Sequence, residues 1–367
     1  MMDRALDLAR RARLLAPPNP AVGCVLVAAD GRVLGEGQTQ RTGAAHAEIM
    51  ALQAAAALGH SVVGATAFVT LEPCAHHGRT GPCCDALITA GIGRVVAALQ
   101  DPNPRVSGQG FARLRAAGIT VEVGPGAAEA RELNLGFFSR MVRQTPWVRL
   151  KIAASLDGQT ALENGSSQWI TSAAARADGH AWRARACAVL TGIGTVLEDD
   201  PQLNVRLVDT PRQPKLVLVD SRLEVPLRAR LWQAERTVLI YTASADPAKT
   251  QALQALGATV VCLPEPASPP TAAKVDLGAM LRDLAAREVN ELHVEAGFKL
   301  NGSLVRAGLV DEFLVYLAPT LLGQGRGMAQ FGPLTALTQA TPLAFQATDM
   351  LGPDLRILAR VPGRDLF

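Results

Sequence analysis

Metal-binding residue types crowd into one stretch, EPCAHHGRTGPCC at residues 72–84, and a shorter motif, HAE, precedes it at residues 46–48. One imidazole and two thiolates suit Zn²⁺, and three protein ligands leave the fourth tetrahedral position for water, as catalytic zinc sites require. The sequence therefore predicts that His46, Cys74 and Cys83 bind zinc. Zinc lowers the pKa of such a water, and a nearby carboxylate can take its proton and later deliver it to a leaving amine. Glu48 is the predicted proton shuttle.

Cys84 allows a second interpretation of the cluster. A closed structural site with Cys84 as fourth ligand would also be ordinary zinc chemistry. Neighbouring side chains at a helix start diverge, however, so we favour the open site. Free cysteine often behaves as a small buried hydrophobe, and we expect this of four residues: Cys24, Cys84, Cys187 and Cys262.

The loop within the motif departs from the usual zinc-deaminase pattern, H-x-E followed by P-C-x-x-C. Eight residues separate Cys74 from Cys83, so the chain must fold over and return. The loop carries His76, His77 and Arg79, and a longer loop over the metal can contribute substrate contacts.

Strand and helix patterns alternate around these motifs, which predicts an α/β layered domain. Helices are expected near residues 3–15, 46–58, 82–90, 108–117 and 127–141, and strands near 22–27, 33–36, 66–70, 94–98 and 119–123. The helical pattern ends around residues 143–146, and a strand begins at Trp147, just after a proline. We therefore expect two domains, residues 1–145 and 146–367. Further strands are expected at 188–191, 215–220, 237–241, 259–263, 291–295 and 312–317.

Composition excludes several classes of protein. Apolar residues make up 49% and charged residues 19% of the chain, a balance that predicts folded cores. The net charge of +3 is small for 367 residues, and no run of Lys and Arg forms a stripe that could follow a phosphate backbone. Nucleic acid is therefore not the expected partner. The start has a helical rhythm unlike a signal peptide, and no run approaches the roughly 18 apolar residues of a membrane span. A cytoplasmic protein without a membrane partner is expected.

The motifs of the first half together resemble the bifunctional deaminase-reductases of bacterial riboflavin biosynthesis: NPAVG at 19–23, HAE at 46–48, TLEPC at 70–74 continuing to Cys83 and Cys84, and DPNP at 101–104. The resemblance implies a cytidine-deaminase-like three-layer α/β/α domain. It implies removal of the 2-amino group from 2,5-diamino-6-(5-phosphoribosylamino)pyrimidin-4(3H)-one, with substrate contacts from Asn19, His76 and Arg79. Gly81 departs from the family, where proline usually precedes Pro82.

The second half is less informative by itself. A strand end at Glu295 leads into KLNGS at 299–303, where backbone N–H groups of a helix start favour phosphate, although a plain strand-to-helix turn gives the same pattern. Arg183 and Arg206 can clamp a phosphate, although scattered arginines are usually solvated. Trp169 can lie against a flat ring, although core packing is its commoner use.

Four further motifs extend the resemblance: LKIAASLDG at 150–158, SQWIT at 167–171, GTVLEDDP at 194–201 and VEAG at 294–297. They imply a dihydrofolate-reductase-like α/β domain that uses NADPH to reduce the ribosyl side chain to a ribityl one. The implied NADPH contacts are Ala153, Trp169, Thr195, Asp199, Ser221, Gly297, Phe298, Lys299, Leu300, Asn301, Gly302 and Ser303. The implied substrate contacts are Ser167, Arg183, Leu203, Arg206 and Glu295.

The resemblance leaves the proton donor of the reduction open between Lys151 and Asp199, and it makes a homodimer or homotetramer plausible. Two other functions compete: a zinc deaminase of nucleosides or tRNA with a non-catalytic second half, and an interaction protein with structural zinc. An aromatic content of 4% counts against tRNA. We expect the two-step enzyme, with one zinc per chain, acting on a small phosphorylated aminopyrimidine.

Overall fold

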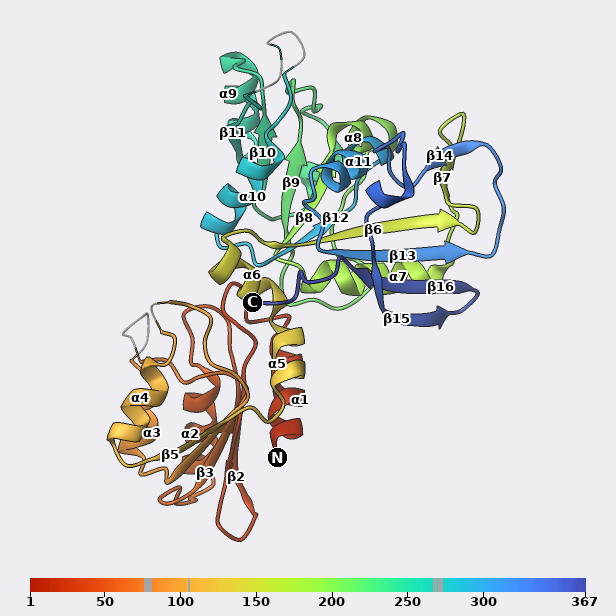
Figure 1. Cartoon of the computed structure of the whole chain (residues 1–367). Helices are drawn as coiled ribbons and strands as arrows, with labels where there is room; N and C mark the ends of the chain where they lie inside the picture. The colour runs from red at the N-terminus through yellow and green to blue at the C-terminus, as the bar shows by residue number, and fades with distance from the viewer. Residues whose placement is uncertain (76–80, 105, 267–268, 270–272) are drawn as a thin grey trace. The chain divides into compact units, whose positions relative to one another are not determined.

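The computed structural model of the chain describes residues 1–75, 81–104, 106–266, 269 and 273–367 (Figure 1). The chain divides into two compact units, Met1–Gln144 together with Phe367, and Thr145–Leu366. Each unit has its own hydrophobic core. None of the described helices is long and apolar enough to cross a membrane.

A five-stranded sheet in the order β2-β1-β3-β4-β5 forms the centre of the first unit. Its strands are β1 (Gly23–Val27), β2 (Val33–Gln38), β3 (Thr66–Val69), β4 (Arg94–Ala97) and β5 (Thr120–Val123). Strand β1 runs antiparallel to both β2 and β3, whereas β3, β4 and β5 are parallel. The beginning of β1 and the end of β3 therefore lie at the same edge of the sheet.

The described part of the first unit contains six helices: α1 (Met2–Ala12), α2 (Ala47–Ala57), α3 (Cys83–Thr89), α4 (Gln109–Ala116), α5 (Ala127–Leu133) and α6 (Leu135–Arg143). Glycines allow close approach, because a Cβ on Gly23 would lie 1.9 Å from the Ala5 carbonyl of α1, and one on Gly37 would lie 2.2 Å from that of Ala47 in α2. Gly37 pairs with Cys24, the neighbour of Gly23, so α1 and α2 cover opposite faces. Helix α5 packs beside α1, whereas α3 packs beside α2 and α4 packs beside α3 (Figure 1). The helices therefore form one layer on each side of the sheet, which confirms the three-layer α/β/α arrangement.

Two expectations about the first unit and the cysteines are wrong. The single helix expected at 127–141 is broken at Asn134, whose side chain accepts the Ala21 N–H at 2.8 Å and donates to the Ala21 carbonyl at 3.0 Å. These hydrogen bonds to Ala21 hold Asn134 in a non-helical conformation, so one helix ends there and another begins. Cys24, Cys84 and Cys187 are buried as expected, but Cys262 is exposed, because it ends the edge strand of its sheet.

The second unit contains a nine-stranded sheet in the order β11-β10-β9-β8-β12-β6-β13-β16-β15. Its strands are β6 (Trp147–Ser155), β8 (Ala188–Gly192), β9 (Lys215–Val219), β10 (Val238–Thr242), β11 (Ala258–Cys262), β12 (Glu291–Val294), β13 (Glu312–Ala318), β15 (Ala344–Leu351) and β16 (Asp354–Arg360). The seven strands from β11 to β13 are parallel, and β16 and β15 add antiparallel. Strands β7 (Gln159–Leu162) and β14 (Gly325–Gly327) form a separate pair.

Helices connect the parallel strands of this sheet: α7 (Ala173–Arg185), α8 (Ile193–Asp199), α9 (Pro247–Ala255), α10 (Leu277–Ala286) and α11 (Phe298–Arg306). Side chains at three helix starts accept a backbone N–H of the first turn, as N-caps do: Ser172, Asp246 and Asp276. The strand–helix alternation confirms the α/β class expected for this half.

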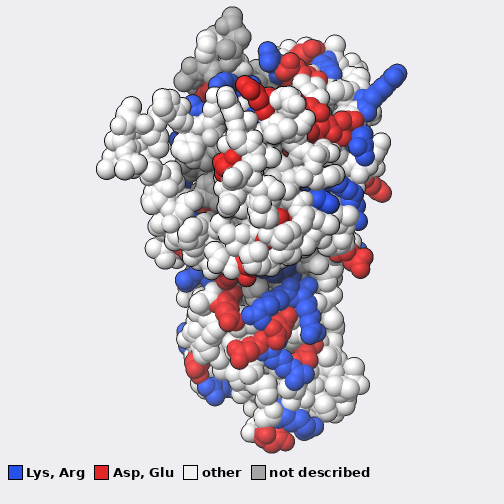
Figure 2. Space-filling model, turned by 90° about the vertical axis from the view of Figure 1, so that its right-hand side faces the viewer, with Lys and Arg blue, Asp and Glu red and all other residues white. Residues whose placement is uncertain are grey.

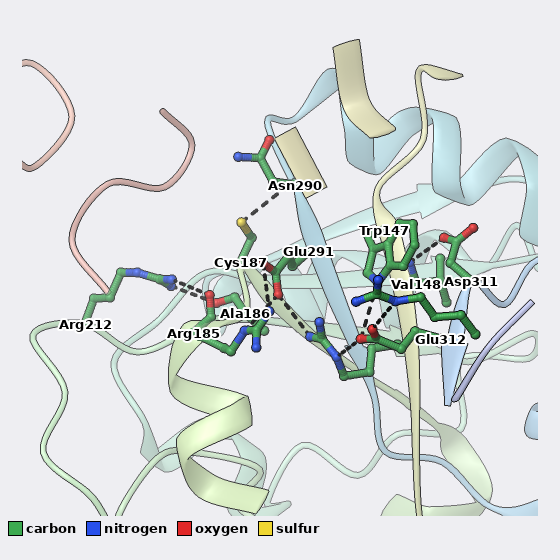
Figure 3. Close-up of polar contacts among 12 residues, drawn as sticks. Trp147, Val148, Arg185, Ala186, Cys187, Arg212, Asn290, Glu291, Asp311 and Glu312 are labelled. Carbon is green, nitrogen blue, oxygen red and sulfur yellow. Dashed lines mark hydrogen bonds and ion pairs between the residues drawn. The ribbon is translucent and has the colours of Figure 1, made fainter. Parts of the chain in front are cut away.

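A buried ionic network holds the amino ends of the central strands (Figure 3). Arg149 pairs with Glu312 and, at 3.0 Å, with Glu291, and Arg360 Nε donates to Glu312 at 2.8 Å. Burial alone would raise the pKa of Glu312, but Arg149 and Arg360 hold it below its ordinary value. The network links β6, β12, β13 and β16 at the edge opposite to the one where most of the predicted reductase residues lie.

Candidate active sites

Three predicted zinc ligands converge in the first unit. His46 is the N-cap of α2, Cys74 follows β3, and Cys83 begins α3. The His46 Nδ1 atom lies 3.7 Å from the Cys74 Sγ and 3.4 Å from the Cys83 Sγ, and all three ligand atoms lie within 4.8 Å of one another. Tetrahedral zinc with bonds of about 2.0 Å to nitrogen and about 2.3 Å to sulfur separates its ligands by about 3.5–3.8 Å. The donor set and its spacing therefore fit zinc.

Cys84 does not join this ligand group among the residues that the structure describes. Its Sγ donates to the carbonyl of Cys74 at 2.9 Å and lies 3.3 Å from the carbonyl of Pro73. The thiol is thus used to hold the loop backbone. This geometry favours the open three-ligand site over the closed structural one.

Glu48 lies in the first turn of α2, only 4% exposed. Burial raises the pKa of Glu48 to about 7, and the negative charge of Cys74 contributes in the same direction. Hydrogen bonds from Cys83 and His46 lower the pKa of the Cys74 thiol. A carboxyl group beside the metal ligands and shielded from solvent is placed to take and return a proton.

Glu72 positions the loop that carries Cys74, a role that the sequence reasoning missed. Its buried carboxylate accepts three backbone N–H groups, those of Asp101 at 3.1 Å, Gly108 at 3.0 Å and Phe111 at 3.2 Å. The backbone also approaches closely here, since a Cβ on Gly110 would lie 2.1 Å from the Pro73 carbonyl. The sequence did contain a signal for this role, namely an acidic residue directly before Pro-Cys. A carboxyl group that is buried there needs hydrogen-bond partners.

The predicted substrate contacts of the first unit are only partly described. Asn19 lies in the turn between α1 and β1, where its N–H donates to the Ala16 carbonyl at 2.8 Å. This turn is at the edge where β3 ends, because the Gly23 carbonyl accepts the Thr70 N–H at 3.1 Å. Asn19 therefore lies near the same end of the strands as the three zinc-ligand residues. His76 and Arg79 lie outside the described residues.

In the second unit, Glu295 joins two of the predicted cations. Arg183 of α7 donates to both of its oxygens, at 2.7 and 2.9 Å, and the Lys151 Nζ lies 3.9 Å away. Burial alone would raise the pKa of Glu295, but Arg183, His293 and Lys151 hold it well below its ordinary value. Burial lowers the pKa of Lys151. Neither Lys151 nor Arg183 is a solvated surface residue.

Helix α7 also holds the loop that contains Leu203 and Arg206. Arg183 Nη1 donates to the carbonyl of Asn204, and the Arg206 side chain reaches Asn204 Oδ1 at 3.2 Å. The Arg206 N–H donates to His180 Nδ1 at 3.1 Å. Sequence reasoning missed His180, although its place one helical turn before Arg183 puts both on one face of the helix.

The predicted cofactor turn forms where β8 and β12, adjacent parallel strands, lead into α8 and α11. A Cβ on Gly297 would lie 3.7 Å from the Thr195 Oγ1, and one on Gly192 would lie 3.1 Å from Leu300. Asn301 Oδ1 is buried without a hydrogen-bond partner among the described residues, which fits a missing polar ligand. Crevices at the carboxyl ends of parallel strands are common dinucleotide sites.

The remaining predicted cofactor and substrate residues lie around this edge. Ala153 is on β6, Ser221 follows β9, and Ser167 is half-buried in the segment before α7. Trp169 is 67% exposed and lies under the Arg176 guanidinium, 4.6 Å from its ring centroid, so core packing is excluded. Asp199 is the exposed last residue of α8.

Comparisons with known proteins find a matching family for each of the two units. Residues 1–99 match the cytidine and deoxycytidylate deaminase zinc-binding region, and residues 146–355 match the RibD C-terminal domain. The chain is 44% identical over 361 residues to the riboflavin biosynthesis protein RibD of Escherichia coli K12, covering 96% of each chain. It is 40% identical over 356 residues to that of Aquifex aeolicus, covering 97% of this chain and 96% of the relative.

Solved structures show the same relationship. Acinetobacter baumannii RibD matches with a TM-score of 0.88 and 40% identity over 98% of this chain and 97% of that one. A Thermotoga maritima diaminohydroxyphosphoribosylaminopyrimidine deaminase/5-amino-6-(5-phosphoribosylamino)uracil reductase matches with a TM-score of 0.84 and 33% identity, with the same coverage. The chain therefore belongs to the RibD family of riboflavin biosynthesis enzymes, with a zinc-binding deaminase domain followed by a reductase domain.

Proposed function

We propose that the chain catalyses two consecutive reactions. The first unit deaminates 2,5-diamino-6-(5-phosphoribosylamino)pyrimidin-4(3H)-one by hydrolysis. The second unit then uses NADPH to reduce the ribosyl side chain of 5-amino-6-(5-phosphoribosylamino)uracil to a ribityl one. The observation that carries this proposal is the convergence of three zinc-ligand atoms within 4.8 Å, with a buried carboxyl group two residues after His46.

In the deaminase site, His46, Cys74 and Cys83 hold one zinc ion. Zinc, when bound, supplies a water of lowered pKa. Glu48 takes the proton from the attacking water and delivers it to the departing amino group, and its burial keeps this exchange away from bulk solvent. Asn19 contacts the substrate from the turn before β1, and His76 and Arg79 do so from the loop.

In the reductase site, Arg183 and Arg206 bind the substrate phosphate. Arg183 and Lys151 both pair with the Glu295 carboxylate, and Arg206 adds a third positive charge in its neighbourhood, so an excess of two positive charges matches a phosphate dianion. Ser167, Leu203 and Glu295 complete the substrate contacts.

NADPH, when bound, supplies the hydride. The residues that would hold it lie at and near the carboxyl ends of β8, β12 and the neighbouring strands. Its contacts are Ala153, Trp169, Thr195, Asp199, Ser221, Gly297, Phe298, Lys299, Leu300, Asn301, Gly302 and Ser303. Lys151 is the better proton donor to the sugar oxygen, because it lies beside Arg183 and Glu295, whereas Asp199 is exposed at the end of α8.

The chain also forms a homo-oligomer through the β15 side of the second unit. Residues 327–348 contain no charged residue, and β15 is the outer strand of its sheet. Leu337 is 95%, Phe345 73% and Met350 64% exposed. Figure 2 looks onto this side of the chain and shows a broad surface with few charged groups. An exposed edge strand with apolar side chains needs a partner, and a second copy supplies a self-complementary one.

The same proposal assigns the chain to the cytoplasm, with neither nucleic acid nor membrane as a partner. The small net charge of +3 counts against nucleic acid as a partner, and no helix in the described part of the chain is long and apolar enough to cross a membrane. Sedimentation of wild-type protein and a Phe345→Glu variant tests the interface: a dimer or larger assembly should dissociate in the variant, and a monomeric wild type would contradict it.

The activity is tested by two assays on the purified zinc-loaded chain. Glu48→Gln should abolish release of ammonia from the diaminopyrimidine phosphate while NADPH oxidation with the deaminated compound continues. Surviving deaminase turnover would remove Glu48 from the mechanism. If the wild-type chain oxidises no NADPH with the deaminated pyrimidine phosphate, the reductase assignment is wrong.

A further inference from the structure

His180 is a buried titratable residue in the second unit that the mechanism above does not use. It lies on α7, is only 5% exposed, and precedes Arg183 by one helical turn. Side chains three residues apart on a helix share a face, so His180 and Arg183 both point toward the loop that carries Arg206. Their contacts to that loop are the Arg206 N–H on His180 Nδ1 and the Asn204 carbonyl on Arg183.

The protonation state of this imidazole is determined by its surroundings. The backbone N–H of Arg206 can only donate, so His180 Nδ1, at 3.1 Å, must be the unprotonated acceptor. Burial, with the positive charges of Arg183 and Arg206, lowers the pKa of His180 to about 4. The ring is therefore neutral near neutral pH, and its one proton is on Nε2.

The Nε2–H of His180 is left open. It makes no hydrogen bond to any residue in the described part of the chain, and Nε2 is not among the enclosed side-chain atoms of that part that lack a partner, so a ligand can reach it. Three cations, Arg183, Arg206 and Lys151, are close enough to affect its titration. A donor of this kind in an otherwise buried side chain is placed to meet an acceptor on a ligand.

We propose that His180 is a further substrate-binding residue of the reductase site, and that its Nε2–H donates a hydrogen bond to a phosphoryl oxygen of the substrate's ribosyl 5′-phosphate. The inference rests on the proposed reductase function. Arg183 and Arg206 supply the charge for the phosphate, and the neutral imidazole adds a directional donor. The bond from the Arg206 N–H also fixes the ring, so that the donor and the Arg206 loop are positioned together.

Two substitutions separate the two nitrogens. His180→Asn keeps an acceptor near the position of Nδ1 and removes the donor, whereas His180→Gln can place an amide N–H near the position of Nε2 and removes the acceptor. Each variant is assayed for NADPH oxidation with the phosphorylated substrate and with its dephosphorylated counterpart. NADPH binding, followed by fluorescence, shows that the reductase unit is folded.

A hydrogen bond to a charged group predicts a rise of about 10-fold or more in the KM of His180→Asn for the phosphorylated substrate. For the dephosphorylated substrate the change should stay below about twofold, since the bond is absent there. His180→Gln should recover part of the preference for phosphate, which a merely structural imidazole would not explain. Should His180→Asn fail to bind NADPH, retained phosphate preference in His180→Gln supports the proposal, and its complete loss overturns it.

An unchanged KM in His180→Asn, or an equal rise for both substrates, overturns the assignment of His180. These results differ from a failure of the proposed function, in which the wild-type chain itself oxidises no NADPH with either substrate.

Discussion

Replacing Glu72 by Gln tests how the zinc loop is positioned. Oε2 of Glu72 accepts the N–H groups of Asp101 and Gly108, and Oε1 accepts that of Phe111. A glutamine amide has only one oxygen, so at least one of these N–H groups must face an NH₂ group. A buried donor without an acceptor costs about 1–3 kcal/mol, and the loss of negative charge weakens the other bonds by about 1 kcal/mol more. We expect a total of about 3 kcal/mol.

The cost should appear in zinc binding, because Glu72 fixes the chain immediately before Cys74. Residues that orient metal ligands typically contribute 10–100-fold in metal affinity, and about 3 kcal/mol corresponds to about 100-fold. The assay is equilibrium competition for zinc with a chromogenic chelator, together with thermal unfolding of the zinc-loaded chain. Glu72→Gln should show a raised zinc Kd and a lower Tm.

Glu122→Gln is the matched control in the same unit. Glu122 pairs with Arg94 on the surface, 47% and 49% of their side chains being exposed, so the change should cost less than about 1 kcal/mol. Zinc affinity should equal that of the wild type. If Glu72→Gln also binds zinc within about twofold of the wild type and melts at the same temperature, Glu72 does not position the loop.

Three further predictions concern the two units. Glu312→Gln should destabilise the second unit by about 3–5 kcal/mol in urea unfolding because it removes the buried negative charge that Arg149 and Arg360 share, whereas Glu224→Gln at an exposed pair should cost less than about 1 kcal/mol. If Lys151 donates the proton, NADPH oxidation should fall as pH rises through a pKa below the ordinary 10.5, and activity undiminished beyond that pH would contradict it. Cys83→Ser should lose stoichiometric zinc by elemental analysis while Cys84→Ser retains one ion per chain; zinc loss in Cys84→Ser would restore the four-ligand interpretation.

Short sequence motifs were sufficient to predict the zinc ligands and the carboxyl group beside them. His46 and Glu48 are two residues apart, and Pro-Cys and Pro-Cys-Cys frame one loop, so the donor types for zinc and a carboxyl group could be recognised locally. The α/β class followed from the alternation of apolar patterns, and the family comparisons confirm the expected deaminase–reductase. They do not favour the alternative of a nucleoside or tRNA deaminase.

Other features depend on contacts that no local pattern encodes. The break between α5 and α6 comes from a hydrogen bond between Asn134 and Ala21, 113 residues apart. Likewise, the exposure of Cys262 follows from the place of β11 at the edge of its sheet.

The sequence by itself determined which residue types are available: the zinc donors, the carboxyl group beside them and the two alternating α/β halves. Only the tertiary structure decided which side chains meet. Arg183 and Glu295 are 112 residues apart, and they pair because α7 packs against β13, while β12, which ends just before Glu295, lies two strands away beside β6. The tautomer of His180 and the anchoring of Glu72 follow from the same cause, since strand order brings distant backbone groups to buried side chains that must satisfy their hydrogen bonds.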